Sequence, residues 1–387
     1  MKVLTVLGTR PEIIRLCLII KLLDQHCHHI LVHTGQNFDE RLSALFFKEL
    51  RLRAPDIFLN VQGASFASQI GEILQRSEAI FQEQQPDRVL ILGDTNSGLS
   101  AIIARRMGIP VYHLEAGNRC FDFRVPEESN RRIIDHLSSV LMPYTHRSRE
   151  NLLREGIPAD QIYVTGNPIN EVMEHFAEEI ASSTALQDHA LEENRFFLVT
   201  AHRAENVDLE HRLRSLLDAL VSLHERYRYP IICSLHPRTR SKAKKFGIPL
   251  AHPGLRFIEP LGFFDFIKLE QLAFCVLTDS GTVQEETCIL GVPNVTLRDV
   301  TERPETIECG SNVLAGCDSE TILNMVELVT QHRRSWDAPE EYLRPDVANT
   351  AVRILLAHHA RAGREAGRMP HRMPAAAAKR LLTAALS

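Results

Sequence analysis

Long apolar runs free of charge are missing from this 387-residue sequence. The early stretch "IIRLCLIIKLL" is interrupted by Arg15 and Lys21, and "MKVLTVLGTRPE" passes directly from an apolar run into a polar turn. These patterns predict neither a signal peptide nor a membrane span.

An excess of one charge is missing as well, because 44 basic side chains stand against 49 acidic ones and the net charge is −5. Nucleic acids and anionic membrane surfaces attract strongly basic proteins, so neither is an expected partner. We expect the partner to be a small molecule.

Paired cysteine motifs are also absent. The eight cysteines include no CxxC pair and do not follow the spacing of secreted disulfide scaffolds. They are Cys17, Cys27, Cys120, Cys233, Cys275, Cys288, Cys309 and Cys317. We therefore expect reduced thiols in a cytoplasmic protein.

Alternating β-rich and helical patterns fill most of the chain, whose 44% hydrophobic and 24% charged residues suit a globular protein of two domains. One series of runs is "KVLTVLGTR", "HILVHTGQ", "RVLILGDT", "VYHLEAGNR" and "IYVTGN". A second series is "RFFLVTAHR", "PIICSLHPRTR", "CVLTDSG" and "VPNVTLRD". This alternation predicts an α/β fold with two doubly wound, Rossmann-like domains.

The domain limits follow from the change of series. We expect the first domain at residues 1–168 and the second at 169–345. A C-terminal helix that returns to the first domain and a basic tail are expected at 346–387. Open α/β sheets bind ligands beyond the carboxyl ends of their strands, so the expected site is a cleft between the domains.

The segment "VLGTRPEIIRL" ends a strand at Gly8 and starts a helix with Pro11 in its first turn. Arg10 is then expected beside free N–H groups of the helix start, an arrangement that suits a phosphate. A plain helix cap with a solvated arginine explains the same residues equally well. No Gly-Lys-Ser/Thr follows, so the segment is not a Walker A loop.

A second strand-to-helix junction is "LTDSGTVQEETCILGVP". Asp279, Ser280 and Gly281 form its turn, and Gly281 allows a ligand to approach the backbone closely. Glu285 is explained by the helix dipole alone. Glu286 would repel a diphosphate, so a ligand role for it must concern a neutral group such as ribose hydroxyls.

Further polar residues end other strands. Asp94 in "GDTNSG" and His202 in "TAHRAEN" are either structural or part of the site. Arg238 and Arg240 in "HPRTR" are either phosphate contacts or surface residues.

The stretch "HLEAGNRCFDFRVPEESNRRIIDH" is rich in His and acidic residues. A helix is predicted from Pro126, with Glu128 and Arg132 as a solvated i,i+4 pair. Its buried stripe should consist of Ile133, Ile134 and Leu137. His113 and Glu115 have no third ligand in register, so we expect no metal.

Six motifs together resemble those of the non-hydrolysing UDP-N-acetylglucosamine 2-epimerases. They are "GTRPE", "GDT", "EAG" with "PEESNR", "TAHRAEN", "TDSGTVQEE" and "TERPE". The resemblance runs from residue 2 to about residue 360 and implies a fold like that of the glycosyltransferase-B enzymes. It also implies a UDP-sugar substrate, with UDP bound by the second domain at 169–345, a homodimer, and the use of no cofactor or metal.

The resemblance further implies inversion at carbon 2 by anti elimination of UDP, a 2-acetamidoglucal intermediate and re-addition of UDP. One acid must remove the proton and another must return it, because a base on one side cannot invert the centre. The leaving diphosphate needs positive charge around it.

Matching positions in the motifs carry roles over to this sequence. The implied catalytic residues are Asp94, Glu115, Glu127 and His202. The implied UDP-binding residues are Arg10, Ser280 and Gly281 for the phosphates, Phe266 for uracil and Glu286 for ribose. Arg131, Arg303 and Arg15 are expected near the sugar. Arg15 stands where many relatives have lysine, which changes the donor geometry.

The expected activity is the interconversion of UDP-N-acetylglucosamine and UDP-N-acetylmannosamine. Two alternatives stay open. The compact "NRCFDFRV" and "PLGFFDF" resemble the branch that epimerises modified sugars, of the diacetamido-uronic acid or 6-deoxy-talosamine type. A glycosyltransferase-B-type sugar transferase would use the same two-domain cleft.

Overall fold

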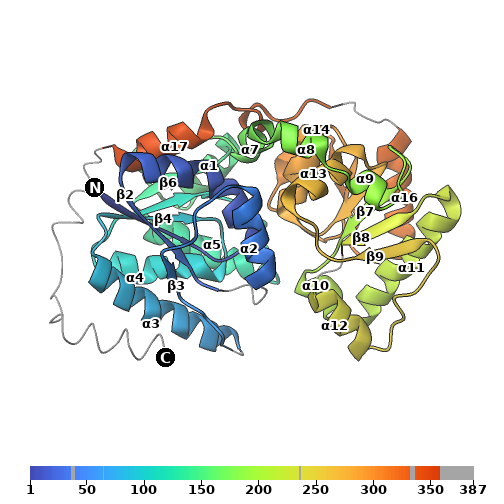
Figure 1. Ribbon diagram of the computed structural model, residues 1–387, viewed down its shortest axis with the longest axis horizontal. Helices are drawn as coiled ribbons and strands as arrows, with labels where there is room; N and C mark the ends of the chain where they lie inside the picture. The colour runs from blue at the N-terminus through green and yellow to red at the C-terminus, as the bar shows by residue number, and fades with distance from the viewer. Residues whose placement is uncertain (36–39, 64, 235–236, 332–335, 358–387) are drawn as a thin grey trace. The chain divides into compact units, whose positions relative to one another are not determined.

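The computed structural model describes the whole chain except residues 36–39, 64, 235–236, 332–335 and 358–387. The chain forms two compact units (Figure 1). Unit 1 contains Met1–Val172 and the described residues from Arg344 onward, and unit 2 contains Met173–Leu343.

Unit 1 is built on a parallel six-stranded sheet of order β3-β2-β1-β4-β5-β6. Its strands are β1 (Lys2–Leu7), β2 (His28–His33), β3 (Ile57–Phe58), β4 (Arg88–Leu92), β5 (Val111–Leu114) and β6 (Val140–Met142). The almost wholly apolar sequences of β1 and β4 are typical of strands that are buried on both faces.

The helices of unit 1 follow its strands in turn. They are α1 (Arg10–His26), α2 (Glu40–Glu49), α3 (Phe66–Gln84), α4 (Ala101–Arg106), α5 (Pro126–Leu137), α6 (His146–Arg154) and α17 (Val347–Leu356), with short 3-10 helices at Asn96–Ser100 and Ala159–Gln161. The chain passes from unit 1 to unit 2 within α7 (Ile169–His175). In Figure 1, α1 and α17 lie on one side of the sheet and α3 and α4 on the other.

Unit 2 repeats this plan with a parallel sheet of order β12-β11-β10-β7-β8-β9. Its strands are β7 (Phe197–Thr200), β8 (Ile231–Ser234), β9 (Leu255–Ile258), β10 (Cys275–Thr278), β11 (Asn294–Thr296) and β12 (Asn312–Leu314). Its helices are α8 (Ala177–Ser182), α9 (Ala185–Asp188), α10 (Ala204–Val207), α11 (Glu210–Tyr227), α12 (Pro237–Lys245), α13 (Phe263–Leu272), α14 (Gly281–Leu290), α15 (Pro304–Glu308) and α16 (Ser319–Gln331), with a 3-10 helix at Glu340–Tyr342.

Both sheets have the strand order of Rossmann folds, so the predicted fold class is confirmed. One predicted strand is wrong. The run "IYVTGN" makes only an isolated bridge between Ile162 and Leu141, and the edge strand β6 is formed by the preceding "VLM" instead. None of the helices in the described part of the chain combines the length and apolar character of a membrane span.

Parallel pairing brings the carboxyl ends of neighbouring strands to one edge of each sheet. In unit 1, Leu92 at the end of β4 pairs with Leu114 at the end of β5. In unit 2, Thr200 at the end of β7 pairs with Thr278 at the end of β10. The residues that follow these four strands therefore cluster in space, one cluster for each unit.

The helix α17 belongs to unit 1, although 171 residues of unit 2 separate it from the rest of that unit. It packs against α1. The guanidinium of Arg88 on β4 donates a hydrogen bond to the carbonyl of Leu355, and the N–H of Ala348 donates to Glu171 Oε2 over 2.8 Å. In the structure, the chain passes from unit 1 to unit 2 at residues 172/173 and back at 343/344. The sequence pattern predicts these two boundaries at 168/169 and 345/346.

Candidate active site

Asp94 follows β4 and is held by an arginine of α5. Arg131 donates from Nε over 3.1 Å and from Nη2 over 2.6 Å to Asp94 Oδ2. Arg131 is buried, whereas the Asp94 side chain keeps 24% of its surface exposed. The structure thus brings two of the predicted residues together and leaves the carboxylate accessible.

Glu115 follows β5 and is a buried carboxylate on a strained backbone. Its φ is +67°, a left-handed conformation that costs a non-glycine residue free energy and that is typical of functional sites. Its Oε2 lies 3.7 Å from Arg15 Nη1, and its Oε1 accepts a 3.3 Å hydrogen bond from Asn118. A Cβ built on Gly93 would lie 4.0 Å from Glu115 Oε2, so Glu115 lies beside the residue that precedes Asp94.

The start of α1 differs from the expectation. Free N–H groups are expected there for a phosphate, but the N–H groups of Gly8 and Thr9 both donate to Glu12 Oε2, over 2.9 and 2.7 Å. Thr95 donates to the other oxygen over 2.9 Å. Burial raises the pKa of Glu12 to about 7, against these hydrogen bonds, which lower it. Arg10 is half-buried, with its guanidinium carbon 6.0 Å from the ring centre of Phe46.

The start of α5 carries one half-buried and one fully buried glutamate. Glu127 is half-buried, and Glu128 is fully buried. Glu128 accepts from Cys120 N over 3.0 Å, from Arg131 over 2.9 Å and from Arg132 over 3.1 and 3.0 Å. The expectation that Glu128 and Arg132 form a solvated pair is therefore wrong.

The burial of α5 differs from its predicted stripe as well. Ile134 is fully buried and Leu137 half-buried, but Ile133 is 41% exposed. The buried face of α5 is instead completed by polar side chains that connect it to the strand ends. They are Glu128, Asn130, Arg131 and Asp135.

A buried polar network behind the two acids was missed by the sequence reasoning. His113 on β5 makes 2.8 Å contacts from Nδ1 to Asp135 and from Nε2 to the carbonyl of Gly93. Asp135 also accepts from Gly117 N over 3.1 Å and pairs with Arg119 over 2.8 Å. The signal was present in the sequence, because a histidine inside a buried strand needs hydrogen-bond partners.

This network ties down the backbone on both sides of the acids. Burial opposes ionisation of Asp135, but the hydrogen bond and charge of His113 and the charge of Arg119 hold the pKa of Asp135 below its usual value. Gly93 precedes Asp94, and Gly117 follows Glu115 by two residues, so the network fixes the backbone from which both acidic side chains project.

Within the described residues, no group of three or more His, Cys, Asp or Glu side chains is placed to hold a metal ion.

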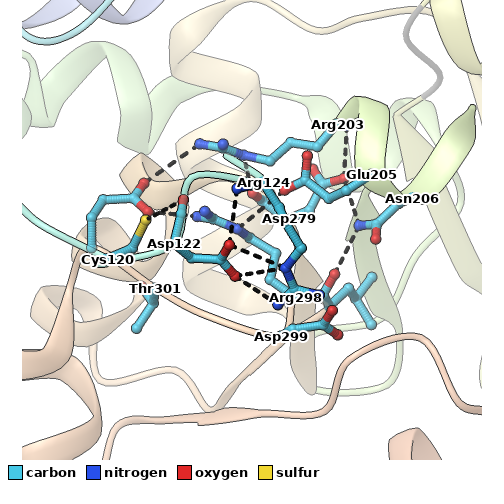
Figure 2. A network of polar contacts seen from close by, with 12 residues as sticks. Cys120, Asp122, Arg124, Arg203, Glu205, Asn206, Asp279, Arg298, Asp299 and Thr301 are labelled. Atoms are coloured by element: carbon cyan, nitrogen blue, oxygen red, sulfur yellow. Dashed lines mark hydrogen bonds and ion pairs between the residues drawn. The ribbon is translucent and has the colours of Figure 1, made fainter. Parts of the chain in front are cut away.

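In unit 2, the fully buried Asp279 at the end of β10 organises the strand ends (Figure 2). Its Oδ2 accepts from the backbone N–H groups of His202 and Arg203, both over 2.9 Å, and from Asn206 over 3.1 Å. Its Oδ1 lies 3.3 Å from His202 Nδ1. Asp279 therefore orients the ring of His202, which stays 39% exposed.

Three arginines and their acidic partners lie near the N-terminus of α14. A Cβ built on Gly281 would meet Glu302 Oε1 at 2.7 Å and the guanidinium of Arg303 at 3.5 Å, so a larger residue there would displace the Glu302 carboxylate. Glu302 accepts from Arg298 over 2.8 Å and lies 3.4 Å from Arg203. Arg298 also lies 3.6 Å from Glu205, and Arg303 pairs with Glu285, so acids match the three arginines. The feature that suits an anion here is the N-terminus of α14 itself.

The acids of α14 are buried. Glu285 pairs with Arg303 in the interior, which is a stronger reason for its presence than the helix dipole. Glu286 is 5% exposed. It faces Glu270 of α13, and burial together with the charge of Glu286 raises the pKa of Glu270 well above its usual value. Phe266, also on α13, is half-buried and packs against the hydrophobic core that contains Leu269 of α13 and Val283 of α14.

The arginines of "HPRTR" pair with other residues than those at the N-terminus of α14. Arg238 pairs with Asp208 over 2.7 Å and Arg240 with Glu259, and both arginines are about half exposed on α12. Of the two interpretations left open, the surface one is favoured.

Comparison with known proteins gives consistent matches. A family model described as UDP-N-acetylglucosamine 2-epimerase matches residues 21–356. A UDP-N-acetylglucosamine 2-epimerase of Methanocaldococcus jannaschii is 41% identical over 347 residues, which cover 88% of this chain and 95% of that protein. A UDP-2,3-diacetamido-2,3-dideoxy-D-glucuronate 2-epimerase of Pseudomonas aeruginosa is 38% identical over 328 residues, with 84% and 90% covered.

Solved structures agree. The Methanocaldococcus jannaschii UDP-GlcNAc 2-epimerase in complex with UDP-GlcNAc and UDP matches with a TM-score of 0.87 and 39% identity, covering 92% of this chain and 99% of that one. The glycosyltransferase WaaG, 13% identical with a TM-score of 0.56 and covering 92% and 100%, shares the fold alone.

Proposed function

Because this chain belongs to the UDP-N-acetylglucosamine 2-epimerase family, we propose that it interconverts UDP-N-acetylglucosamine and UDP-N-acetylmannosamine without releasing free sugar. The observation that carries the proposal is the placement of Asp94 and Glu115. Two carboxylates follow adjacent parallel strands, each beside a buried arginine. An inversion at carbon 2 needs acid groups of this kind on both faces of the sugar.

Unit 1 would carry the proton transfers. A carboxylate removes the proton at carbon 2 while the bond from carbon 1 to the diphosphate oxygen breaks, which leaves a 2-acetamidoglucal and UDP. UDP then adds back to carbon 1, and a second acid delivers a proton to the opposite face of carbon 2. Asp94, Glu115 and Glu127 are the proposed acids, with Arg131 and Arg15 positioning the first two.

Unit 2 would hold UDP as the UDP-binding domain. Ser280 and Gly281 offer the N-terminus of α14 to the diphosphate, and His202 and Arg303 add donors and charge there. Glu286 is the proposed ribose ligand and Phe266 the proposed uracil platform. Arg10 of unit 1 is proposed as a further phosphate contact, although Glu12 occupies the N–H groups beside it.

A modified UDP-N-acetylhexosamine is the second candidate substrate. The Pseudomonas aeruginosa relative that is named for a diacetamido-glucuronate is 38% identical, close to the 41% of the Methanocaldococcus jannaschii relative. The loop 118–125, which precedes Glu127, carries exposed rings at Phe121 and Phe123 over Arg132. We propose this loop as the part that selects the sugar.

The deciding experiment is incubation with UDP-N-acetylglucosamine in heavy water, followed by NMR. Deuterium at carbon 2 of both epimers, with UDP still attached, is the expected result. The absence of exchange with this sugar but exchange with a diacetamido-uronic acid derivative would favour the second candidate. A glycosyltransferase would exchange the carbon 2 proton of neither sugar. A hydrolysing epimerase would release free UDP and N-acetylmannosamine.

We further propose that the enzyme acts as a homodimer in the cytoplasm. Light scattering coupled to size exclusion tests the first part, and a monomer would contradict it. Fractionation of cells that express the tagged chain tests the second part, and recovery in the membrane fraction would contradict it.

A further inference from the structure

Two free thiols of unit 2 face each other. The Sγ atoms of Cys288 and Cys309 are 3.6 Å apart. Cys288 lies in the last turns of α14, and Cys309 follows the last residue of α15. Disulfide sulfurs are about 2.05 Å apart, so rotation of the two side chains could close the remaining gap.

The two thiols differ in reactivity. Cys309 is half-buried, and its hydrogen bond with Cys288 lowers its pKa to about 6, against the effect of burial. Cys288 is buried, and the same hydrogen bond together with burial raises its pKa. An accessible thiolate beside a buried thiol is the arrangement of an attacking and a resolving cysteine.

The two sides of the pair differ in their surroundings. Gly310 follows it with a φ of +88° and no atom near its Cβ position. On the other side, the indole N–H of Trp336 donates a 3.1 Å hydrogen bond to the carbonyl of Cys288, which holds the end of α14. Cys309 is therefore the more accessible partner, and Cys288 is the more firmly held one.

The pair connects α14 and α15, the two helices beside the proposed diphosphate site. The N-terminus of α14 lies against Glu302 and Arg303, and Arg303 precedes α15 and pairs with Glu285 of α14. A covalent link between the far ends of α14 and α15 would therefore shift Arg303 and Glu302, which lie against the N-terminus of α14.

We propose that Cys288 and Cys309 form a reversible disulfide with small-molecule disulfides as oxidant, and that this bond weakens UDP binding. The second half rests on the proposed function, and the first half does not. Disulfides of reducing compartments are usually of this transient, regulatory kind.

The exchange balances in two steps. The Cys309 thiolate attacks one sulfur of a small disulfide such as oxidised glutathione, forms a mixed disulfide and releases one glutathione thiolate. Cys288 loses its proton to solvent and attacks the Cys309 sulfur, which forms the internal bond and releases a second thiolate. The two thiolates take up the two protons that the protein lost, so one disulfide is reduced as another forms.

The test exposes the intact reduced protein to oxidised glutathione, blocks the remaining thiols with an alkylating agent and maps the peptides by mass spectrometry. The expected product is a cross-linked pair of peptides containing Cys288 and Cys309, lost on treatment with dithiothreitol. Cys288→Ala should instead accumulate a glutathione adduct at Cys309. Cys309→Ser should leave Cys288 unmodified. The buried Cys233, whose pKa burial raises to about 12, is the internal control and should not react.

A stable glutathione adduct at Cys309 in the unmutated protein, or reaction spread over other cysteines, would overturn the disulfide. Calorimetry with UDP then tests the second half. We expect affinity to fall about fivefold or more on oxidation, and to be unaffected by the same treatment in Cys309→Ser. Equal affinity of the cross-linked and reduced forms would overturn the regulation, whereas no UDP binding by the reduced form would count against the proposed function alone.

Discussion

At the scale of residues, each of the two strand-end acids in unit 1 has a cationic neighbour and an anchored backbone. Arg131 binds Asp94 through two hydrogen bonds, and Arg15 lies 3.7 Å from Glu115. The fully buried His113 ties the backbone of Gly93 to Asp135. Proton transfer to carbon requires groups fixed at short range, and these contacts supply that fixation.

Removing a single carboxylate should therefore stop turnover without unfolding the protein. We expect Asp94→Asn, Glu115→Gln and Glu127→Gln each to lower kcat by about 10²-fold or more, measured as deuterium incorporation at carbon 2. The exposed Asp160→Asn is the matched control and should behave as the unmutated protein. Near-normal turnover in any of the three would remove that residue from the mechanism.

Gly281 allows a second test at this scale. In Gly281→Ala the new methyl group meets Glu302 Oε1 at 2.7 Å, so the Glu302 carboxylate or the N-terminus of α14 must shift and UDP affinity should fall about tenfold or more. Gly71→Ala is the control, because nothing lies within 4 Å of that Cβ position and alanine favours the helix α3 by at most about 1 kcal/mol. Unchanged calorimetric affinity in Gly281→Ala would contradict the proposed diphosphate site.

Part of this residue-level picture could be predicted. Strand-end positions for Asp94 and His202 follow from local patterns alone, since a polar residue after an apolar run in an α/β sequence ends a strand. The burial of Glu128 could not be predicted. It depends on Cys120 folding back across eight residues to donate its N–H, and helix periodicity does not contain that contact.

At the scale of elements, the packing of α13 on α14 brings two buried carboxyl groups together, those of Glu270 and Glu286. Glu270 is fully buried, and burial with the charge of Glu286 raises its pKa well above the ordinary value. A raised carboxyl pKa stabilises the folded state only at low pH. This stability is fully present below about 4.5, the pKa expected in the unfolded chain, and is lost as pH rises through the folded pKa.

We therefore expect Glu270→Gln to become more stable relative to the unmutated protein as pH rises. Urea unfolding at pH 5 and at pH 8 should show a larger gain in midpoint at pH 8. Glu178→Gln, at an exposed position on α8, should show no such trend. A gain of the same size at both values would mean that Glu270 is not a source of the pH dependence.

Elements were easier to predict than their edges. The continuous apolar runs gave β1, β2, β4 and β5 and their counterparts β7, β8, β10 and β11, because buried parallel strands need apolar side chains on both faces. The two-residue β3 and the edge strand β6 are too short for any periodicity. "IYVTGN" looked like a strand from its composition but found only one bridging partner.

At the scale of the whole molecule, the family resemblance drawn from six short motifs is confirmed by a match over residues 21–356. The motifs sufficed because each lies at a strand end or helix start, where chemistry constrains the sequence most. The proposed UDP contacts, apart from Arg10, all belong to the continuous segment of unit 2, whose sheet and cores are complete in themselves.

An isolated fragment of residues 173–343 should therefore fold cooperatively and bind UDP, yet exchange no proton at carbon 2. Circular dichroism with thermal unfolding checks the fold, and calorimetry with UDP checks binding. The same fragment with Gly281→Ala is the control and should bind UDP more weakly. A folded fragment without measurable UDP affinity would show that the nucleotide depends on unit 1.

The place of α17 has a consequence for synthesis on the ribosome. The strands of unit 1 emerge first, but the face of α1 that α17 covers stays bare until residues 347–356 have been made. At about 5–20 residues per second, translation of unit 2 alone occupies on the order of ten seconds or more. During that interval the nascent chain exposes an apolar surface, so chaperone binding should concentrate on α1 and end when α17 is released.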